Sequence, residues 1–463
     1  MAVDLFAAEE IDEVRSGPLV VGLLLAVATV LADSSVVVLA LPDVLSTFDV
    51  SIERVSWVIT GFNLVLALAA VPAAYLATRA GANGVAAAGL AVFALASAAC
   101  TVAGNFDVLL AARCVQAASG AVVVCAALRI LARLLGSPAQ GVAAWAGAAA
   151  IGAAVGPAAG GALTQAFSWR GVFAAQVPLA LVPLLLLARG RVLMPADVAV
   201  EGARPRLAPN LALALVSAAL TAALFLLVLE LVRGWGLSPL AAAAVLTVIP
   251  AATLVTAAVA RSAPGATGLA AAGVILIAGG LAALAVVPSA SIGWTFLPQA
   301  LIGAGLALTL PGLTREALAG VGSLAIHGGW TIGARHAGVV VGLLILTPIF
   351  TADLLTQQAA AERSGASLVL NSRLSLQAKL RLGDAIDQSL RTTRNRLPDL
   401  GPAFRAQHPS GGDRPTYDQL RSALTEQVRR AATHAFSRAF LVAAGIALLA
   451  LVPLAVGRRE AAA

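Results

Sequence analysis

Long apolar runs separated by short polar stretches dominate the pattern of this chain. Each run has about the 20 residues that an α-helix needs to cross a hydrocarbon core roughly 30 Å thick. Because lipid offers the backbone no hydrogen-bond partners, such runs are stable there only as helices. We expect spans at about 18–41, 55–77, 84–104, 107–128, 139–162 and 170–188, and then at about 210–231, 238–260, 266–287, 292–313, 325–350 and 438–456. The pattern predicts an all-α membrane protein with twelve transmembrane helices in two six-helix halves.

Polar segments divide the chain at its ends, in its middle and near its C-terminus. We expect an acidic tail at 1–17, an N-terminal half at 18–188, an arginine-rich linker at 189–209, helices 7–11 of the C-terminal half at 210–350, an insert at 351–437, and helix 12 with a second tail at 438–463. In the insert, Tyr417, Leu420, Leu424 and Val428 recur at helical spacing. We therefore expect a helical insert that extends helices 11 and 12 and adds at least one further helix. A disordered insertion is the alternative.

Composition strengthens this assignment and excludes several functions. Apolar residues make up 60% of the chain and charged residues 11%, whereas soluble domains have about 25% charged residues. The net charge of +7 comes from arginines between the apolar runs, so we expect no nucleic-acid partner. His327 and His336 have no third ligand beside them, so we expect no metal site. We also expect no cofactor and no enzymatic activity, because no nucleophile–base set or phosphate loop is present.

Arginine placement predicts how the helices are oriented. With the N-terminus in the cytoplasm, twelve arginines fall in segments on the inner side and only three, Arg54, Arg170 and Arg233, in short outer loops. Cytoplasmic loops carry the excess of basic residues in membrane proteins. We therefore expect a multi-pass protein of the inner cell membrane, with both termini cytoplasmic and the insert extracytoplasmic.

Asp33, Arg113 and Arg335 are charged residues that lie well inside apolar spans. An ionisable group in hydrocarbon is costly, so it usually faces the bundle interior and has a function. We expect Asp33 and Arg113 to lie close together within the N-terminal half, where the acid is able to titrate during a transport cycle. A static ion pair that holds two helices together is the alternative.

Glycines are concentrated in the fifth span, where Gly156, Pro157, Gly160 and Gly161 form a compact group. Glycine lets a neighbouring helix approach closely, and a proline inside a helix removes one backbone hydrogen bond. We expect Gly156 and Pro157 to lie at a tight contact with the C-terminal half, at an interface that opens and closes.

Several of these segments match motifs of one known family. The matching segments are LADSSVVVLALP (31–42), AARCVQAASGA (111–121), GPAAGG (156–161), SWRGVFAAQVP (168–178), GLSPLAAAAVLTVIP (236–250) and ARHAGVVVG (334–342). Together they resemble the major facilitator superfamily, in particular its drug:proton antiporter branch. The loop at 74–83 departs from the family pattern, because the usual aspartate and arginine pair are missing there.

The resemblance implies two halves that rock around a central site, and export driven by inward proton flow. It implies that Asp33 binds the proton and that Arg113 modulates this binding. Polar positions inside the spans give the expected substrate cavity: Asn63, Gln116, Gln299, Trp330, Thr331 and Arg335. The expected partners are a small-molecule substrate, protons and the lipid bilayer.

Three functions remain open from the sequence. The first is a proton-coupled exporter of amphipathic, drug-like or lipid-like compounds, in which the insert shields a departing substrate or docks an extracytoplasmic carrier protein. The second is a facilitator or importer of a small polar solute. The third is a non-transporting receptor or scaffold that uses the outer insert, and the altered loop at 74–83 keeps it open.

Overall fold

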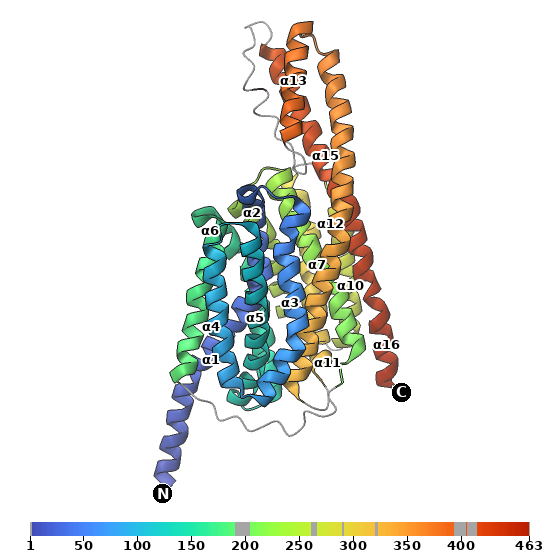
Figure 1. The fold of residues 1–463 in the computed structure, drawn as a ribbon. Coiled ribbons are helices and arrows are strands. Elements are labelled where there is room, and N and C mark those ends of the chain that lie inside the picture. The colour runs from blue at the N-terminus through green and yellow to red at the C-terminus, as the bar shows by residue number, and fades with distance from the viewer. Residues whose placement is uncertain are drawn as a thin grey trace.

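The computed structural model of this chain describes residues 2–189, 204–260, 266–288, 291–319, 323–392, 404 and 414–462. Every regular element within these residues is a helix (Figure 1). The elements are α1 (Ala2–Val38), α2 (Leu41–Phe48), α3 (Ile52–Arg79), α4 (Ala82–Thr101), α5 (Phe106–Leu134), α6 (Pro138–Arg189), α7 (Leu207–Leu229), η1 (Glu230–Gly234), α8 (Pro239–Leu246), α9 (Val248–Ala260), α10 (Ala266–Leu284), η2 (Ile292–Thr295), α11 (Phe296–Leu318), α12 (Leu324–Asn371), α13 (Leu376–Thr392), α15 (Arg414–Leu449) and α16 (Leu451–Ala462).

The predicted spans appear as helices in the predicted order. Ten helical segments of the described chain are long and apolar enough to cross a membrane. One of them, α6, contains two predicted spans, because its backbone leaves the helical region at Phe167 and Ser168. The shorter apolar helix Leu269–Leu284, within α10, supplies the remaining span. Counted this way, the described residues contain twelve spans, and the all-α membrane fold is confirmed.

Small residues let the membrane helices approach closely. In α12, a Cβ atom at Gly338 would meet the backbone of Ala214 on α7, and one at Gly342 would meet the backbone of Ala218. Helices in lipid associate largely through such close van der Waals contact, because lipid tails are as apolar as leucine. The opposite side of α12 packs against α3 of the N-terminal half, where Gly329 faces Ala70. This helix therefore joins the two halves.

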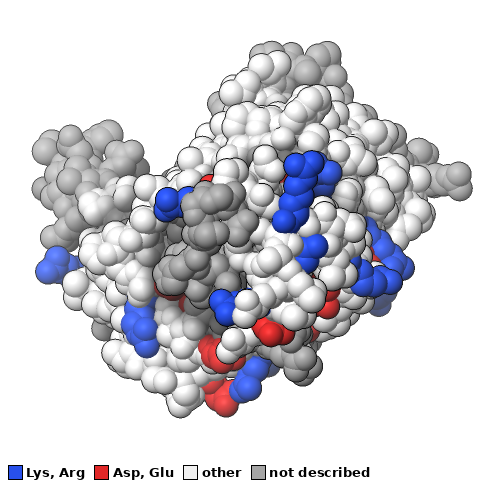
Figure 2. Space-filling view, turned by 90° about the horizontal axis from the view of Figure 1, so that it is seen from above, with Lys and Arg blue, Asp and Glu red and all other residues white. Residues whose placement is uncertain are grey.

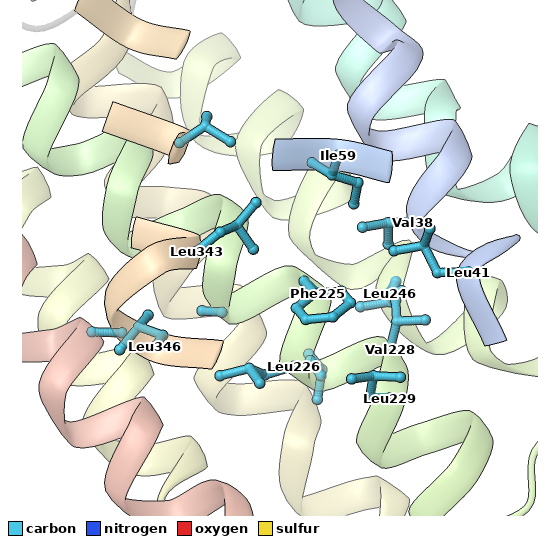
Figure 3. Close-up of a cluster of buried hydrophobic side chains, with 14 of the residues drawn as sticks. Val38, Leu41, Ile59, Phe225, Leu226, Val228, Leu229, Leu246, Leu343 and Leu346 are labelled. Atoms are coloured by element: carbon cyan, nitrogen blue, oxygen red, sulfur yellow. The ribbon is translucent and has the colours of Figure 1, made fainter. Parts of the chain in front are cut away.

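An apolar cluster seals the two halves at one end of the bundle. Figure 3 shows Val38, Leu41 and Ile59 of the N-terminal half opposite Phe225 and Leu246 of the C-terminal half, and all of them are buried. The short helix α2 lies at this end (Figure 1). The sequence pattern missed it, because an apolar run that continues to about residue 41 hides the break after Val38.

Polar contacts hold α2 against both halves. The backbone N–H of Trp169 donates to Oδ2 of Asp43 at 2.9 Å, and Nη2 of Arg233, from the C-terminal half, donates to the backbone oxygen of Pro42 and to Ser46. The sealed end is therefore closed by apolar packing and by hydrogen bonds.

The insert continues α12 and α15 beyond the bundle, at the end opposite both termini, and places α13 beside them (Figure 1). Its own small core contains Val369, Leu382, Phe404, Tyr417 and Leu424. Seen from this end, basic and acidic side chains are scattered over a mostly uncharged surface (Figure 2). Helices thus form the insert as expected. The Pro- and Gly-rich stretch at 398–415 lies largely outside the described residues.

Candidate functional site

The centre of the N-terminal half contains a fully buried ion pair. Arg113 on α5 donates from Nη1 to Oδ1 of Asp33 on α1 at 2.8 Å, and from Nη2 to Oδ2 at 2.5 Å. Both side chains are 0% exposed. This two-point geometry is the strongest that a guanidinium and a carboxylate form. The sequence placed the two residues on the same half, and the structure brings them into direct contact.

Amide side chains complete a closed network around the pair. Gln116 accepts from Nη1 of Arg113 at 2.6 Å and donates to Gln176 at 2.5 Å and to Ser97 at 2.7 Å. Gln176, on α6, donates in turn to Oδ1 of Asp33 at 2.9 Å. Gln176 was not among the expected site residues, although it lies within the matched segment 168–178 and is, like Gln116, a polar position inside a span.

Aromatic rings and one backbone oxygen enclose the guanidinium. Its central carbon lies 4.0 Å from the ring centroid of Phe62 and 5.5 Å from that of Phe173. Nε of Arg113 donates to the backbone oxygen of Val58 at 3.3 Å. A desolvated cation–π contact stabilises the cation by about 2 kcal/mol. The charge of Arg113 is therefore fully compensated without any ligand.

A separate cavity of about 230 Å³ lies between the two halves. Residues of α1, α3 and α6 form one wall, and residues of α7, α8, α9, α11 and α12 form the other. Most of the lining is apolar. The polar side chains are Ser34, Ser35 and Asn63 from the N-terminal half, and Ser217, Thr221, Thr253, Arg335 and His336 from the C-terminal half.

One hydrogen bond crosses this cavity from half to half. Nδ1 of His336 on α12 lies 2.5 Å from Oδ1 of Asn63 on α3. The amide nitrogen of Asn63 donates to Oγ of Ser34 at 3.1 Å and to the backbone oxygen of Ile59 at 2.8 Å. Since an amide oxygen only accepts, Nδ1 of His336 carries the hydrogen in this arrangement. His336 therefore links the C-terminal half to α1 through Asn63.

The structure brings two of the expected cavity residues, Asn63 and Arg335, into the cavity wall. The other four expected positions lie elsewhere. Gln116 belongs to the buried network, and Gln299 donates to Thr295 of its own helical segment. Thr331 donates to the backbone oxygen of His327, and Trp330 is 38% exposed. Neither residue is part of the cavity wall, and the neighbouring Gly329 and Gly333 approach α3 closely.

The expectation for the glycine group needs a correction. A Cβ atom at Gly156 would meet Ser35 on α1, and one at Gly160 would meet the backbone of Val36. These two glycines therefore pack within the N-terminal half and not against the C-terminal half. Gly161 alone of the four faces α8, at Pro239 and Ala243, while Pro157 lines the cavity. The spacing predicted close packing correctly but did not specify the partner helix.

Comparison with known sequences finds one family. The family model described as Major Facilitator Superfamily matches residues 23–352. An uncharacterised transporter of this type from Mycobacterium tuberculosis is 31% identical over 161 residues, which are 34% of this chain and 28% of that protein. The methylenomycin A resistance protein of Bacillus subtilis is 31% identical over 156 residues (33% of this chain, 34% of that protein). The tetracenomycin C resistance and export protein of Streptomyces glaucescens is 30% identical over 174 residues (37% and 32%). The match thus spans about a third of the length of each relative.

Comparison with solved structures shows the same fold. A bacterial homologue of the human lysosomal transporter Spinster, in an inward-facing and unoccupied conformation, has a TM-score of 0.62 at 17% identity and covers 95% of this chain and 98% of its own. A D-xylose–proton symporter has a TM-score of 0.56 at 13% identity and covers 70% of this chain and 89% of its own. From its family match over most of its length and from this fold, the chain belongs to the major facilitator superfamily.

Proposed function

We propose that this protein is a proton-coupled exporter of amphipathic, drug-like or lipid-like compounds that works by alternating access. The observation that carries the proposal is the position of Asp33. Its carboxylate is paired with Arg113 on one face of α1, while the next two residues, Ser34 and Ser35, line the cavity on another face. One turn of helix therefore connects a titratable group to the proposed substrate site.

Proton binding at Asp33 changes the forces on α1. A proton removes the charge of the carboxylate and one of its two acceptor positions for Arg113. Arg113 keeps its contacts with Gln116 and Phe62, so the guanidinium stays in place while its attachment to α1 is weakened. α1 also contacts α6 closely at Gly156 and Gly160. A movement of α1 therefore moves the cavity wall formed by both helices.

The lining of the cavity supports an amphipathic substrate. Leucine, isoleucine, valine, alanine and proline side chains form most of the wall, and hydrogen bonds join Ser34, Asn63 and His336 within it. Relatives whose names describe resistance and export support the outward direction. A facilitator or importer of a small polar solute, the second candidate, requires a more polar lining than this cavity has.

The arginine bias supports cytoplasmic termini in the inner membrane. Both termini lie at the end opposite the insert (Figure 1). With the termini inside, the end sealed by α2 and the apolar cluster faces outward. The described form is then closed toward the outside, and the substrate enters from the cytoplasm or from the inner part of the bilayer.

We assign the outer insert a role in substrate release. A groove of about 430 Å³ with a mostly apolar lining runs between α12, α13 and α15, past Leu354, Leu380 and Val428. It begins on α12, the helix whose membrane part lines the cavity at Arg335 and Val339. The groove therefore suits the apolar part of a substrate that leaves the bundle. Replacement of residues 360–418 by a short Gly/Ser linker tests this role, because wild-type export by a stably inserted variant contradicts it.

Inverted membrane vesicles test the exporter itself. An imposed proton gradient should drive accumulation of one or more members of an amphipathic compound library, and Asp33→Asn should abolish this accumulation. Exchange of substrate across the membrane without a gradient should persist in Asp33→Asn, since the cavity wall is intact. Gradient-driven uptake by Asp33→Asn at the wild-type rate would remove Asp33 from the mechanism. Absence of any transport by the wild type would favour the receptor or scaffold.

A further inference from the structure

The cavity contains a cation without a counter-ion. Arg335 on α12 lines the cavity and is half-buried. Within the described part of the chain, no hydrogen bond or ion pair joins its side chain to another residue. Arg113, inside a span of the N-terminal half, has two carboxylate bonds, an amide bond and an aromatic neighbour. Arg113 therefore has a counter-ion within the protein, whereas Arg335 has none among the described residues.

The described surroundings of Arg335 offer no free acid. The described residues of the cavity wall include no aspartate or glutamate. Asp33 lies behind the wall, where Arg113 and Gln176 already occupy its carboxylate. Glu230 is buried near the outer end of α7 and is not part of the wall. Arg335 is thus the one residue of the described wall with a permanent charge.

Neutral polar groups line the same cavity as this charge. His336 is its neighbour in sequence, and Ser217 and Thr221 come from α7. The hydroxyl groups of Ser217 and Thr221 are able to donate hydrogen bonds to an anion as well as to a neutral oxygen. Leu220, Leu224 and Ile249 provide apolar wall in the same cavity. One wall therefore combines a positive charge, hydrogen-bond donors and an apolar surface.

An unpaired charge inside a membrane protein is unfavourable. Ionisable groups within transmembrane segments almost always pair with another group or face a watery cavity on a substrate pathway. The planar guanidinium matches carboxylate and phosphate groups with two parallel hydrogen bonds. An arginine that no acid among the described residues neutralises, in a cavity between the two halves, is therefore suited to an acid carried by the ligand.

We infer that Arg335 binds an anionic group of the substrate, so that the preferred compounds are amphipathic anions with an apolar body and a single carboxylate or phosphate. This inference rests on the proposed export function and narrows its substrate class. Arg335 acts as a specificity-determining residue and takes no part in binding the proton.

Three probes with ten-carbon chains test the inference: decanoate, decanamide and decylammonium, whose head groups are anionic, neutral and cationic. Binding is measured on purified protein in nanodiscs, with empty nanodiscs subtracted. Wild-type protein should bind decanoate roughly tenfold more tightly than decanamide, the ratio that one charge-assisted contact of about 1.4 kcal/mol gives. Decyl phosphate, as a fourth probe, shows whether a phosphate group is preferred to a carboxylate.

Variants at position 335 distinguish an effect of the charge on binding from a general effect on folding. Arg335→Gln should lose the preference for decanoate while binding decanamide as the wild type does, and Arg335→Lys should retain part of the preference. Arg335→Glu should invert it toward decylammonium. Arg54→Gln, which removes an exposed outer arginine, is the charge control and should behave as the wild type.

Two outcomes overturn the inference in different ways. Equal binding of decanoate and decanamide by the wild type, or an unchanged preference in Arg335→Gln, refutes the anion site and leaves the export of other amphipathic compounds standing. Absence of binding of every probe, together with absence of transport across the compound library, removes the proposed function and the anion site with it.

Discussion

Removal of one partner of the buried ion pair gives the sharpest structural test. In Asp33→Asn, the side chain keeps its shape and its Oδ1 acceptor, which still receives Nη1 of Arg113 and the amide of Gln176. The second carboxylate oxygen becomes an NH₂ group, which faces Nη2 of Arg113 as donor against donor. The buried guanidinium is left with its charge and without an acid.

The expected loss of folding stability in Asp33→Asn follows from the contacts that remain. A hydrogen bond to a charged group contributes about 1.5–3 kcal/mol, and loss of one partner of a buried pair costs about 3–5 kcal/mol. Gln116, Phe62 and Val58 still contact Arg113, so the cost should lie near the lower end, at about 3 kcal/mol. Arg113→Gln should cost a similar amount, because it leaves the carboxylate of Asp33 buried without its cation.

The double variant decides whether the pair acts as a unit. Asp33→Asn combined with Arg113→Gln places neutral amides in contact, so we expect it to be less destabilised than the sum of the single variants by at least about 2 kcal/mol. The assay is reversible unfolding in mixed micelles, followed by tryptophan fluorescence. Additive effects, with an interaction energy near zero, would refute the reasoning that the two charges stabilise each other.

Three further changes probe packing outside the pair. Gly156→Leu should prevent stable folding, because its Cβ meets Ser35 on α1, whereas Gly147→Leu on the same helix should melt as the wild type, since nothing lies within 4 Å of a Cβ there. Trp235→Phe removes the indole hydrogen bond to Thr433 of 3.0 Å and should lower stability by about 1 kcal/mol in the same unfolding assay; no change would show that the bond contributes nothing. Leu382→Ala, at a fully buried position of the insert, should speed hydrogen exchange of α13 and leave α3 unchanged; a matching change in both would show that insert and bundle unfold together.

The spans and the ion pair were predictable because each depends on a strong local cost. Twenty apolar residues in lipid have only one satisfactory backbone conformation, so the helices follow from the pattern alone. The positions of Asp33 and Arg113 are constrained in the same way, since a charged side chain is unfavourable in a membrane without a partner. The resemblance then placed both residues on helices of the same half, and they are in contact.

The cavity wall was harder to predict, because it depends on how helices are rotated and not on what they contain. Gln116 and Asn63 are both polar residues within spans, yet only Asn63 reaches the cavity. The glycines show the same limit: Gly160 and Gly161 are adjacent, but one contacts α1 and the other contacts α8. A rotation of about 100° per residue separates their partners, and a single sequence does not reveal where each face of a helix points.

The most direct test of proton-coupled transport is proton movement driven by substrate. Purified protein is reconstituted with a pH-sensitive dye inside the vesicles, and an outward or inward gradient of a transported compound is imposed without any initial pH difference. We predict that protons move opposite to the compound in wild-type vesicles, and that Asp33→Asn vesicles transport the compound with no proton movement. Substrate flux without proton flux in the wild type, or unchanged proton flux in Asp33→Asn, would contradict the account.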